Sequence, residues 1–259
     1  MTDMQIPRIF DAARRSNRIA RAARHASRRK DAARFVADEI GADMVERLAF
    51  LRAKPDTVLL VGRTGGGIGK SHWGRPVTCA AELDLEQPFG PQLRKLDKPF
   101  DFIGVCGVLD AVNDVPGALI HMRNALAPQG LVIASFVGGA SLPRLRAAML
   151  AANPERPAAR VHPMIDPRAA PSLLQRAGWK DPVVDTHTLS VRYGSLDRLV
   201  RDLREQALGN ALADQAPPLG KAELERARSA FLEGADADGK VTETFEIITL
   251  TGRRSLAGT

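Results

Sequence analysis

Apolar side chains recur with helical spacing through the first fifty residues, in two parts that differ in the size of those side chains. In the first part, over residues 8–30, the stripe is narrow and mostly small, comprising Ile9, Ala13, Ser16, Ala20 and Ala23. In the second part, large side chains recur at a helical period, at Phe35, Val36, Ile40, Met44, Leu48 and Leu51. We expect the second helix to dock on a core. We expect the first to lie exposed and to contribute little to folding, because small side chains bury little apolar area.

After Pro55 the pattern changes to short apolar runs that alternate with helical segments. Runs typical of strands occur at 57–61, 77–83, 100–105, 131–136, 183–191 and 244–250, and helical patterns at 114–126, 141–151, 167–177, 195–208 and 221–233. This alternation predicts an α/β fold with a mostly parallel sheet, which binds ligands at the carboxyl ends of its strands. We expect the strand at 58–61 to lie beside the strand at 102–105. We divide the chain into a helical extension, 1–54, and an α/β domain, 55–259.

Positive charge is concentrated at the start of the chain. Residues 1–34 hold ten of the 37 Lys and Arg residues but three of the 30 Asp and Glu residues, so the other 225 residues carry 27 of each sign. The basic stretch at 8–30 therefore predicts an electrostatic contact with an acidic protein or another anionic surface. Aromatic residues are not interleaved with its arginines, which argues against nucleic acid as the partner.

Two cysteines, Cys79 and Cys106, provide neither a disulfide framework nor a metal-binding cluster, and we predict no metal site. The chain contains no apolar run long enough to cross a bilayer. The start of the chain lacks the apolar segment of a secretory signal. We expect a cytoplasmic protein, or a protein of the mitochondrial matrix in a eukaryote, because an Arg- and Ala-rich start is also typical of transit peptides.

A glycine-rich turn follows the first expected strand and has three interpretations. It resembles the cofactor loop of class I methyltransferases, with Gly62 and Gly66 in place, but Leu60 replaces the usual acidic residue and Thr64 the middle glycine. Residues 65–71 resemble a deviant phosphate-binding P-loop, in which Lys70 would contact phosphates and Ser71 would contact Mg²⁺. The third interpretation is a flexible turn without a ligand, since short glycine motifs recur by chance.

Residues 99–252 carry a longer series of motifs in one register. They include Phe100-Asp101-Phe102, Val112-Asn113-Asp114-Val115-Pro116-Gly117, Gly138-Gly139-Ala140, His162-Pro163, Leu173-Leu174-Gln175-Arg176-Ala177-Gly178-Trp179 and Thr244-Phe245-Glu246. This series resembles the methyltransferase-like assembly factors of respiratory complex I, one branch of which hydroxylates arginine, and more loosely the malonyl-carrier-protein methyltransferases. The resemblance implies a Rossmann-like methyltransferase fold and S-adenosylmethionine as cofactor.

The chain departs from this family where the cofactor would bind. Asp110-Ala111 replaces the family's His-Trp, so the aromatic residue beside the adenine is missing. About 40 residues separate Gly62 from Phe102, whereas two βα units need roughly 50–60. We therefore expect that one strand or helix has been lost from the N-terminal half of the sheet.

The candidate cofactor-binding residues lie in the glycine turn and at the ends of the next two strands. The resemblance implies three turn residues, Gly62, Thr64 and Gly66. It also implies two acids that could replace the ribose-binding residue, Glu82 and Asp84, and Asp110 at the position beside the adenine. No catalytic residue stands out. Two functions remain open: an S-adenosylmethionine-dependent enzyme, or a non-catalytic scaffold or assembly factor that acts through its basic arm. A P-loop ATPase is a minor alternative. Because Leu60 cannot accept hydrogen bonds, we predict weak or absent cofactor binding.

Overall fold

The computed structural model describes residues 8–74, 77–81, 83–93 and 98–256, and its centre is a six-stranded sheet with the order β2-β1-β3-β4-β6-β5. All strands run in the same direction except β6, which is antiparallel to both of its neighbours. The strands are β1 (Val58–Gly62), β2 (Thr78–Ala80), β3 (Phe100–Cys106), β4 (Leu126–Gly138), β5 (Lys180–Tyr193) and β6 (Val241–Arg253). The predicted α/β fold with a mostly parallel sheet is confirmed.

The pairing of β1 with β3 is also as predicted. Val58 lies opposite Phe102 and Val61 opposite Val105, in a parallel register that continues to Gly62 and Cys106. On its other side β1 pairs with the three-residue β2, which is the edge of the sheet. Among the described residues between β2 and β3 there is no further strand, only the one-turn helix α3 (Phe89–Gln92). The described part of the N-terminal half is therefore short, as expected, with β2 at the edge of the sheet.

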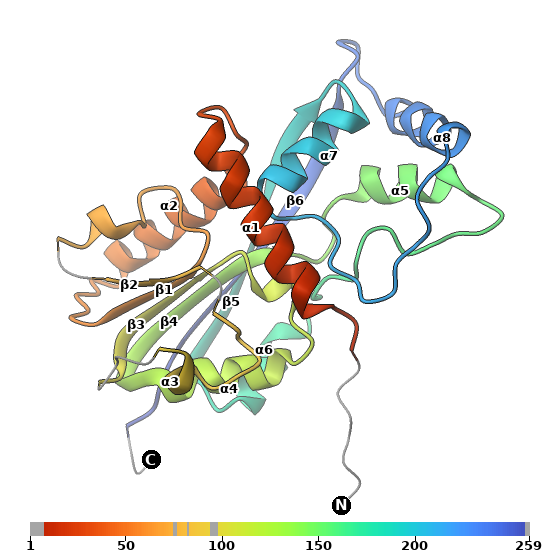
Figure 1. The fold of residues 1–259 in the computed structure, drawn as a ribbon. Helices are drawn as coiled ribbons and strands as arrows, with labels where there is room; N and C mark the ends of the chain where they lie inside the picture. The colour runs from red at the N-terminus through yellow and green to blue at the C-terminus, as the bar shows by residue number, and fades with distance from the viewer. Residues whose placement is uncertain (1–7, 75–76, 82, 94–97, 257–259) are drawn as a thin grey trace, which may run out of the picture.

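Helices cover both faces of the sheet (Figure 1). The cluster of buried side chains on one face joins β1, β3 and β4 to α2 (Phe35–Phe50), α5 (Pro143–Ala152), α7 (Leu196–Glu205) and α8 (Lys221–Leu232). The cluster on the other face includes side chains of α3, α4 (Val115–Ala125) and α6 (Ala170–Arg176). Helix α2 buries Val36, Ile40, Met44 and Leu48, as its large apolar stripe predicts.

Helix α1 (Ala12–Arg28) packs beside α7 and crosses the loops that follow β2 and β3 (Figure 1). Its orientation contradicts the expectation from the small apolar stripe, because Ala13, Ser16 and Ala23 face solvent. The buried residues of α1 are instead Arg18 and Ala22. The physical reason is electrostatic: carboxylates at the strand ends attract arginines, whereas the small stripe offers little apolar area to bury.

Residues at the end of α7 form hydrogen bonds with the segment that connects α1 to α2. The buried carboxylate of Glu205 accepts hydrogen bonds from the Ala33 amide at 2.8 Å and from Arg29 at 3.2 Å. The side chain of Gln206 accepts a hydrogen bond from the Val36 amide, also at 2.8 Å, in the first turn of α2. The basic segment is therefore joined to the body of the protein at several points. No helix in the described part of the chain is long and apolar enough to cross a membrane.

Candidate cofactor site

Three carboxylates gather where β2 and β3 end, at the edge of the sheet at which α/β folds bind ligands. Asp84 and Glu86 lie in the loop after β2, and Asp110 lies in the short helix η2 (Leu109–Ala111) after β3. The side chain of Asp84 is 41% exposed, whereas that of Asp110 is 3% exposed. The structure thus brings together Asp84 and Asp110, two of the predicted cofactor-binding residues. Glu82, a third, lies outside the described residues.

The carboxylate of Asp110 is bound by Arg18 of α1. One guanidinium nitrogen, Nη2, donates to both carboxylate oxygens of Asp110, at 2.9 and 3.0 Å, and Nη1 donates to the Gly209 carbonyl at 3.0 Å. The Arg18 side chain is 8% exposed, so both charged groups are almost excluded from water. Hydrogen bonds between two ionised groups are stronger than neutral ones, and this pair connects α1 to the end of β3.

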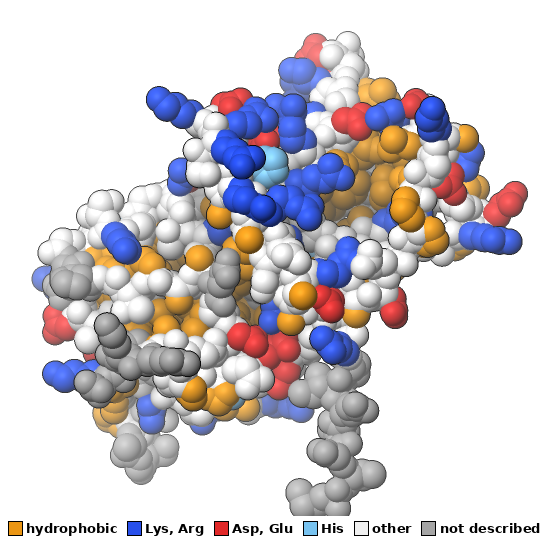
Figure 2. Space-filling view, in the orientation of Figure 1, with side chains coloured by type: hydrophobic (Ala, Val, Ile, Leu, Met, Phe, Trp, Pro, Cys, Tyr) orange, Lys and Arg blue, Asp and Glu red, His pale blue; other side chains and the backbone are white. Residues whose placement is uncertain are grey.

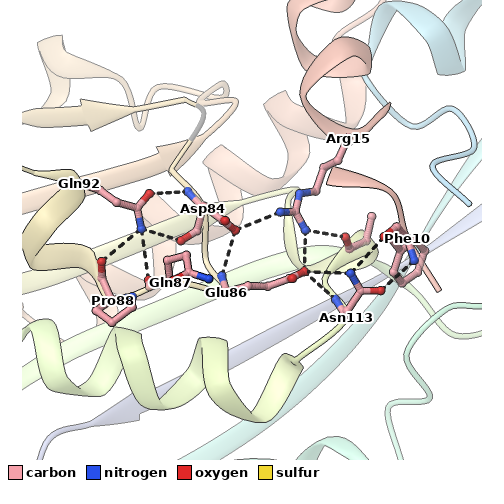
Figure 3. Close-up of polar contacts among 9 residues, drawn as sticks. Phe10, Arg15, Asp84, Glu86, Gln87, Pro88, Gln92 and Asn113 are labelled. Atoms are coloured by element: carbon pink, nitrogen blue, oxygen red, sulfur yellow. Dashed lines mark hydrogen bonds and ion pairs between the residues drawn. The ribbon is translucent and has the colours of Figure 1, made fainter. Parts of the chain in front are cut away.

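One turn earlier on α1, Arg15 binds the two acids that follow β2 (Figure 3). Its guanidinium contacts Asp84 Oδ1 at 3.0 Å and Glu86 Oε1 at 2.8 Å. Burial raises the pKa of Glu86, but hydrogen bonds from the Asn113 amide and from Arg15 outweigh it and hold this pKa below its ordinary value. Glu86 is therefore ionised at neutral pH, and it pairs with a cation from the protein itself.

Asn113 holds the residue that precedes α1. Its side-chain oxygen accepts a hydrogen bond from the Phe10 amide at 2.8 Å, and its side-chain nitrogen donates to the Phe10 carbonyl at 3.1 Å (Figure 3). The Phe10 ring packs edge-on against His162, with ring centroids 5.4 Å apart. The start of α1 is therefore fixed by specific contacts at both its backbone and its first large side chain.

His162 is buried beneath α1, with Nε2 3.6 Å from Asp110 Oδ2. Burial lowers the pKa of His162 below its ordinary value; Arg18 and Arg146 lower it further, and attraction to Asp110 opposes the shift. The imidazole is therefore neutral at pH 7. Sequence reasoning gave His162 no partner, since 52 positions separate it from Asp110 and no local pattern connects them.

The space left between α1 and the strand ends is small. The cavity there has a volume of about 90 Å³, lined by Arg15, Ile19, Asp84, Leu85, Val108 and Val112. Small-molecule sites in proteins usually have volumes of roughly 300–1,000 Å³. This cavity is smaller than that range.

Gly66 in the turn after β1 and Gly41 in α2 are explained by the contact between the turn and this helix. A Cβ atom on Gly66, where φ is +52°, would lie 1.9 Å from the Asp38 carbonyl oxygen, and one on Gly41 of α2 would lie 1.8 Å from the Gly65 carbonyl oxygen. The Gly66 amide donates to the Asp38 side chain at 3.0 Å. Thr64, in the same turn, is half-buried. The turn and α2 therefore touch backbone to backbone, which requires glycine irrespective of any ligand.

Two further positions decide what this turn can bind. Leu60, which stands where the family carries its acid, is fully buried in the core cluster that includes α2. Lys70 and Ser71 are exposed on a single 3₁₀ turn, η1 (Lys70–His72). A P-loop requires an α-helix whose N-terminus faces the phosphate, and no α-helix follows this turn within the described residues before α3. The geometry does not match a P-loop.

A family model described as a methyltransferase domain matches residues 23–183, and the chain belongs to this family. It is 30% identical over 156 residues to a malonyl-[acyl-carrier protein] O-methyltransferase of Halorhodospira halophila, covering 59% of this chain and 51% of that protein. It is 26% identical over 246 residues to malonyl-[acyl-carrier protein] O-methyltransferase 1 of Coxiella burnetii, covering 90% and 86%. It is 30% identical over 161 residues to the human mitochondrial arginine-hydroxylase NDUFAF5, covering 60% and 46%.

The chain thus spans about half the length of the first and third of these relatives. Among solved structures, a putative methyltransferase from Bacillus halodurans is similar at a TM-score of 0.48 and 11% identity, over 82% of this chain and 98% of that one. The family model and the sheet order define the class: a methyltransferase-like α/β protein with a mostly parallel sheet, in which β2 is the edge strand among the described residues.

Proposed function

We propose that this chain is a non-catalytic member of the methyltransferase family, in which α1 takes the place of S-adenosylmethionine. The observation that carries this proposal is the pairing of Arg18 with Asp110 and of Arg15 with Asp84. In the resembled family an acid at the end of the second strand binds the ribose. Here the acceptors at that edge are engaged by arginines of the same chain.

The remaining residues also fit the cofactor poorly. The cavity of about 90 Å³ is too small, Leu60 is buried in the core, and Ala111 provides no aromatic ring. Bringing the ammonium group of a ligand to this turn without an acidic partner costs about 2–3 kcal/mol or more. Family membership does not show that the chain binds the cofactor, because proteins that share a fold can differ in the chemistry of their sites.

The function that we propose for such a protein is that of a scaffold or assembly factor that binds an acidic protein surface through residues 8–30. Arg24 and Arg28 of α1 are exposed, and Figure 2 shows a basic region across the middle of the molecule. We place the protein in a reducing compartment, the cytoplasm or the mitochondrial matrix. Its two cysteines are free, and Cys79 is exposed.

A second candidate is an S-adenosylmethionine-dependent enzyme in which α1 moves away before the cofactor binds. It is favoured by the relatives, which are named as methyltransferases and as an arginine-hydroxylase, and by the exposure of Asp84. In this candidate Gly62, Gly66 and Asp84 would hold the cofactor. Breaking the buried Arg18–Asp110 pair is the step that opposes it.

Calorimetric titration with S-adenosylmethionine separates the two candidates. We expect no binding to the wild-type chain, and micromolar binding would overturn the non-catalytic proposal. An Arg15→Ala/Arg18→Ala variant tests whether α1 masks a competent site, and Arg24→Ala, on the exposed side of the same helix, is the matched control. Binding to the double variant alone would show a site blocked by α1. Parallel titration with ATP and Mg²⁺ tests the P-loop alternative, for which we expect no heat.

A further inference from the structure

A second cavity lies on the other side of α1, between this helix and the residues that follow α7. Its volume is about 300 Å³, and its lining carries four arginines and three amides but no carboxylate. The arginines are Arg14, Arg18, Arg21 and Arg204. The cavity shares Arg18 with the cofactor region, through its pair with Asp110, but Arg15, Asp84 and Asp110 do not line it.

The arginines of this cavity have hydrogen-bonding capacity that the described chain does not use. Nη1 of Arg14 and Nε of the nine-tenths buried Arg18 are shielded from water, and neither has a hydrogen-bond partner among the described residues. In the same part of the chain, no carboxylate lies within ion-pair distance of Arg14, Arg21 or Arg204. A buried donor without an acceptor costs about 1–3 kcal/mol, and several cations in one cavity repel one another. An anion would remove both costs.

An apolar cavity adjoins the basic one and shares Arg204, Gly209 and Asn210 with it. Its volume is about 230 Å³, and its walls come from α5, α7 and the loop before α6. The apolar wall includes Leu142, Leu145, Met149, Val161, Val200 and Leu203. Figure 2 shows the same arrangement, with a cluster of blue side chains beside an orange hollow. Taken together, the cavities fall within the usual volume of small-molecule sites, roughly 300–1,000 Å³.

We propose that the two cavities bind one amphipathic anion, with an aliphatic chain in the apolar cavity and a phosphate or carboxylate head among the arginines. The head would receive charge-assisted hydrogen bonds from the arginines that line this cavity, Arg14, Arg18, Arg21 and Arg204. The chain would cover partly buried apolar side chains, among them Met149, Val161 and Val200. Arg18 would take part through Nε, because its other two guanidinium nitrogens bind Asp110 and Gly209. The proposal accounts for Arg14 and Arg21, which line a cavity without a carboxylate.

The test is calorimetric titration of the full chain with decyl phosphate at concentrations at which it stays monomeric. Inorganic phosphate and decanol are the controls for the head and the chain. We expect decyl phosphate to bind at least about tenfold more tightly than either control, since both cavities contribute. Arg21→Gln/Arg204→Gln should weaken binding about tenfold, through the loss of two charge-assisted contacts. Arg201→Gln removes an exposed charge from α7 outside the cavity, and it should leave binding unchanged.

The result that overturns the proposal is equal binding of decyl phosphate by the wild-type chain and the double variant, or no binding at all. Cosedimentation with vesicles of phosphatidylglycerol and phosphatidylcholine distinguishes a membrane headgroup from a free ligand. The chain could also bind vesicles but not decyl phosphate, with Arg201→Gln weakening vesicle binding as much as the double variant does. That result would show that a basic surface, and not the cavity, binds the anion. Tighter binding of inorganic phosphate than of decyl phosphate would show that the apolar cavity is not part of the binding site.

Discussion

Arg18 and Asp110 lie 92 positions apart in the chain, and their side chains meet in two hydrogen bonds of 2.9 and 3.0 Å that water scarcely reaches. Each of these groups would be expensive to bury alone, because a charge removed from water loses its hydration. Together they join the first helix to the loop after β3. Their pairing makes the basic start of the chain part of the folded domain rather than an appendage.

We expect loss of either partner to destabilise the protein strongly. Arg18→Met leaves the buried carboxyl group of Asp110 without its partner, and Asp110→Leu leaves the buried guanidinium of Arg18 without its partner. Each should lower the free energy of unfolding by about 3–5 kcal/mol, as measured by urea denaturation. The double variant, Arg18→Met/Asp110→Leu, should recover most of that loss, since apolar pairs often replace buried ion pairs at little cost. Single variants within about 1 kcal/mol of wild type would contradict this assignment.

Deletion of residues 1–30 should lower the melting temperature by about 10 °C, because it leaves Asp110 and Glu86 without their arginines. The small stripe of α1 alone predicts a change of only a few degrees. Differential scanning calorimetry distinguishes these results. Arg21→Ala/Arg24→Ala, which removes two exposed charges from the same helix, should stay close to the wild-type temperature.

Gly66→Ala should destabilise the protein far more than Gly67→Ala. Both residues have positive φ, +52° and +88°, so both substitutions strain the backbone. A Cβ atom on Gly66 would also lie 1.9 Å from the Asp38 carbonyl oxygen, whereas one on Gly67 would meet nothing within 4 Å. We expect a loss of about 3 kcal/mol or more at Gly66 and about 1 kcal/mol at Gly67, measured by urea denaturation. Equal losses would mean that backbone strain alone accounts for these glycines.

The stability of the protein should decrease as the pH falls below about 6.5, the pKa of histidine in an unfolded chain. Since burial lowers the pKa of His162, the unfolded chain takes up this proton first. The contribution of His162 is therefore fully present above that pH and is lost as the pH falls toward the lowered value. Urea denaturation at pH 7.5 and 5.5 should show a smaller decrease for His162→Gln than for wild type. His72→Gln, which removes an exposed histidine, is the control.

The sequence predicted those parts of the fold that correspond to a periodic pattern of apolar residues. Helix α2 buries Val36, Ile40, Met44 and Leu48, because large apolar side chains at helical spacing line one face of the helix and this face packs on the core. The short N-terminal half was predictable as well, because the distance from Gly62 to Phe102 is too short for two βα units.

The orientation of α1 could not be predicted in this way. Amphipathic reasoning counts arginine as a solvent-facing residue, yet Arg18 is buried because its partner lies at the end of β3. Nothing near Arg18 in the chain signals Asp110. A weaker signal was present: Arg15 and Arg18 share one face of a helix, and Asp84 and Asp110 follow the two parallel strands that flank β1. Matching these two sets would have placed the arginines inward.

The contacts of α1 also order events in time as the chain is made. Arg18 binds the carbonyl of Gly209, 191 positions later, and Phe10 forms a β-bridge with Leu212. Chains emerge from the ribosome N-terminus first, so α1 is synthesised well before Gly209 and Leu212 exist. Long-range contacts of this kind close late, because the intervening chain must already be organised. Until these contacts form, the arginines of α1 are open to other anionic groups.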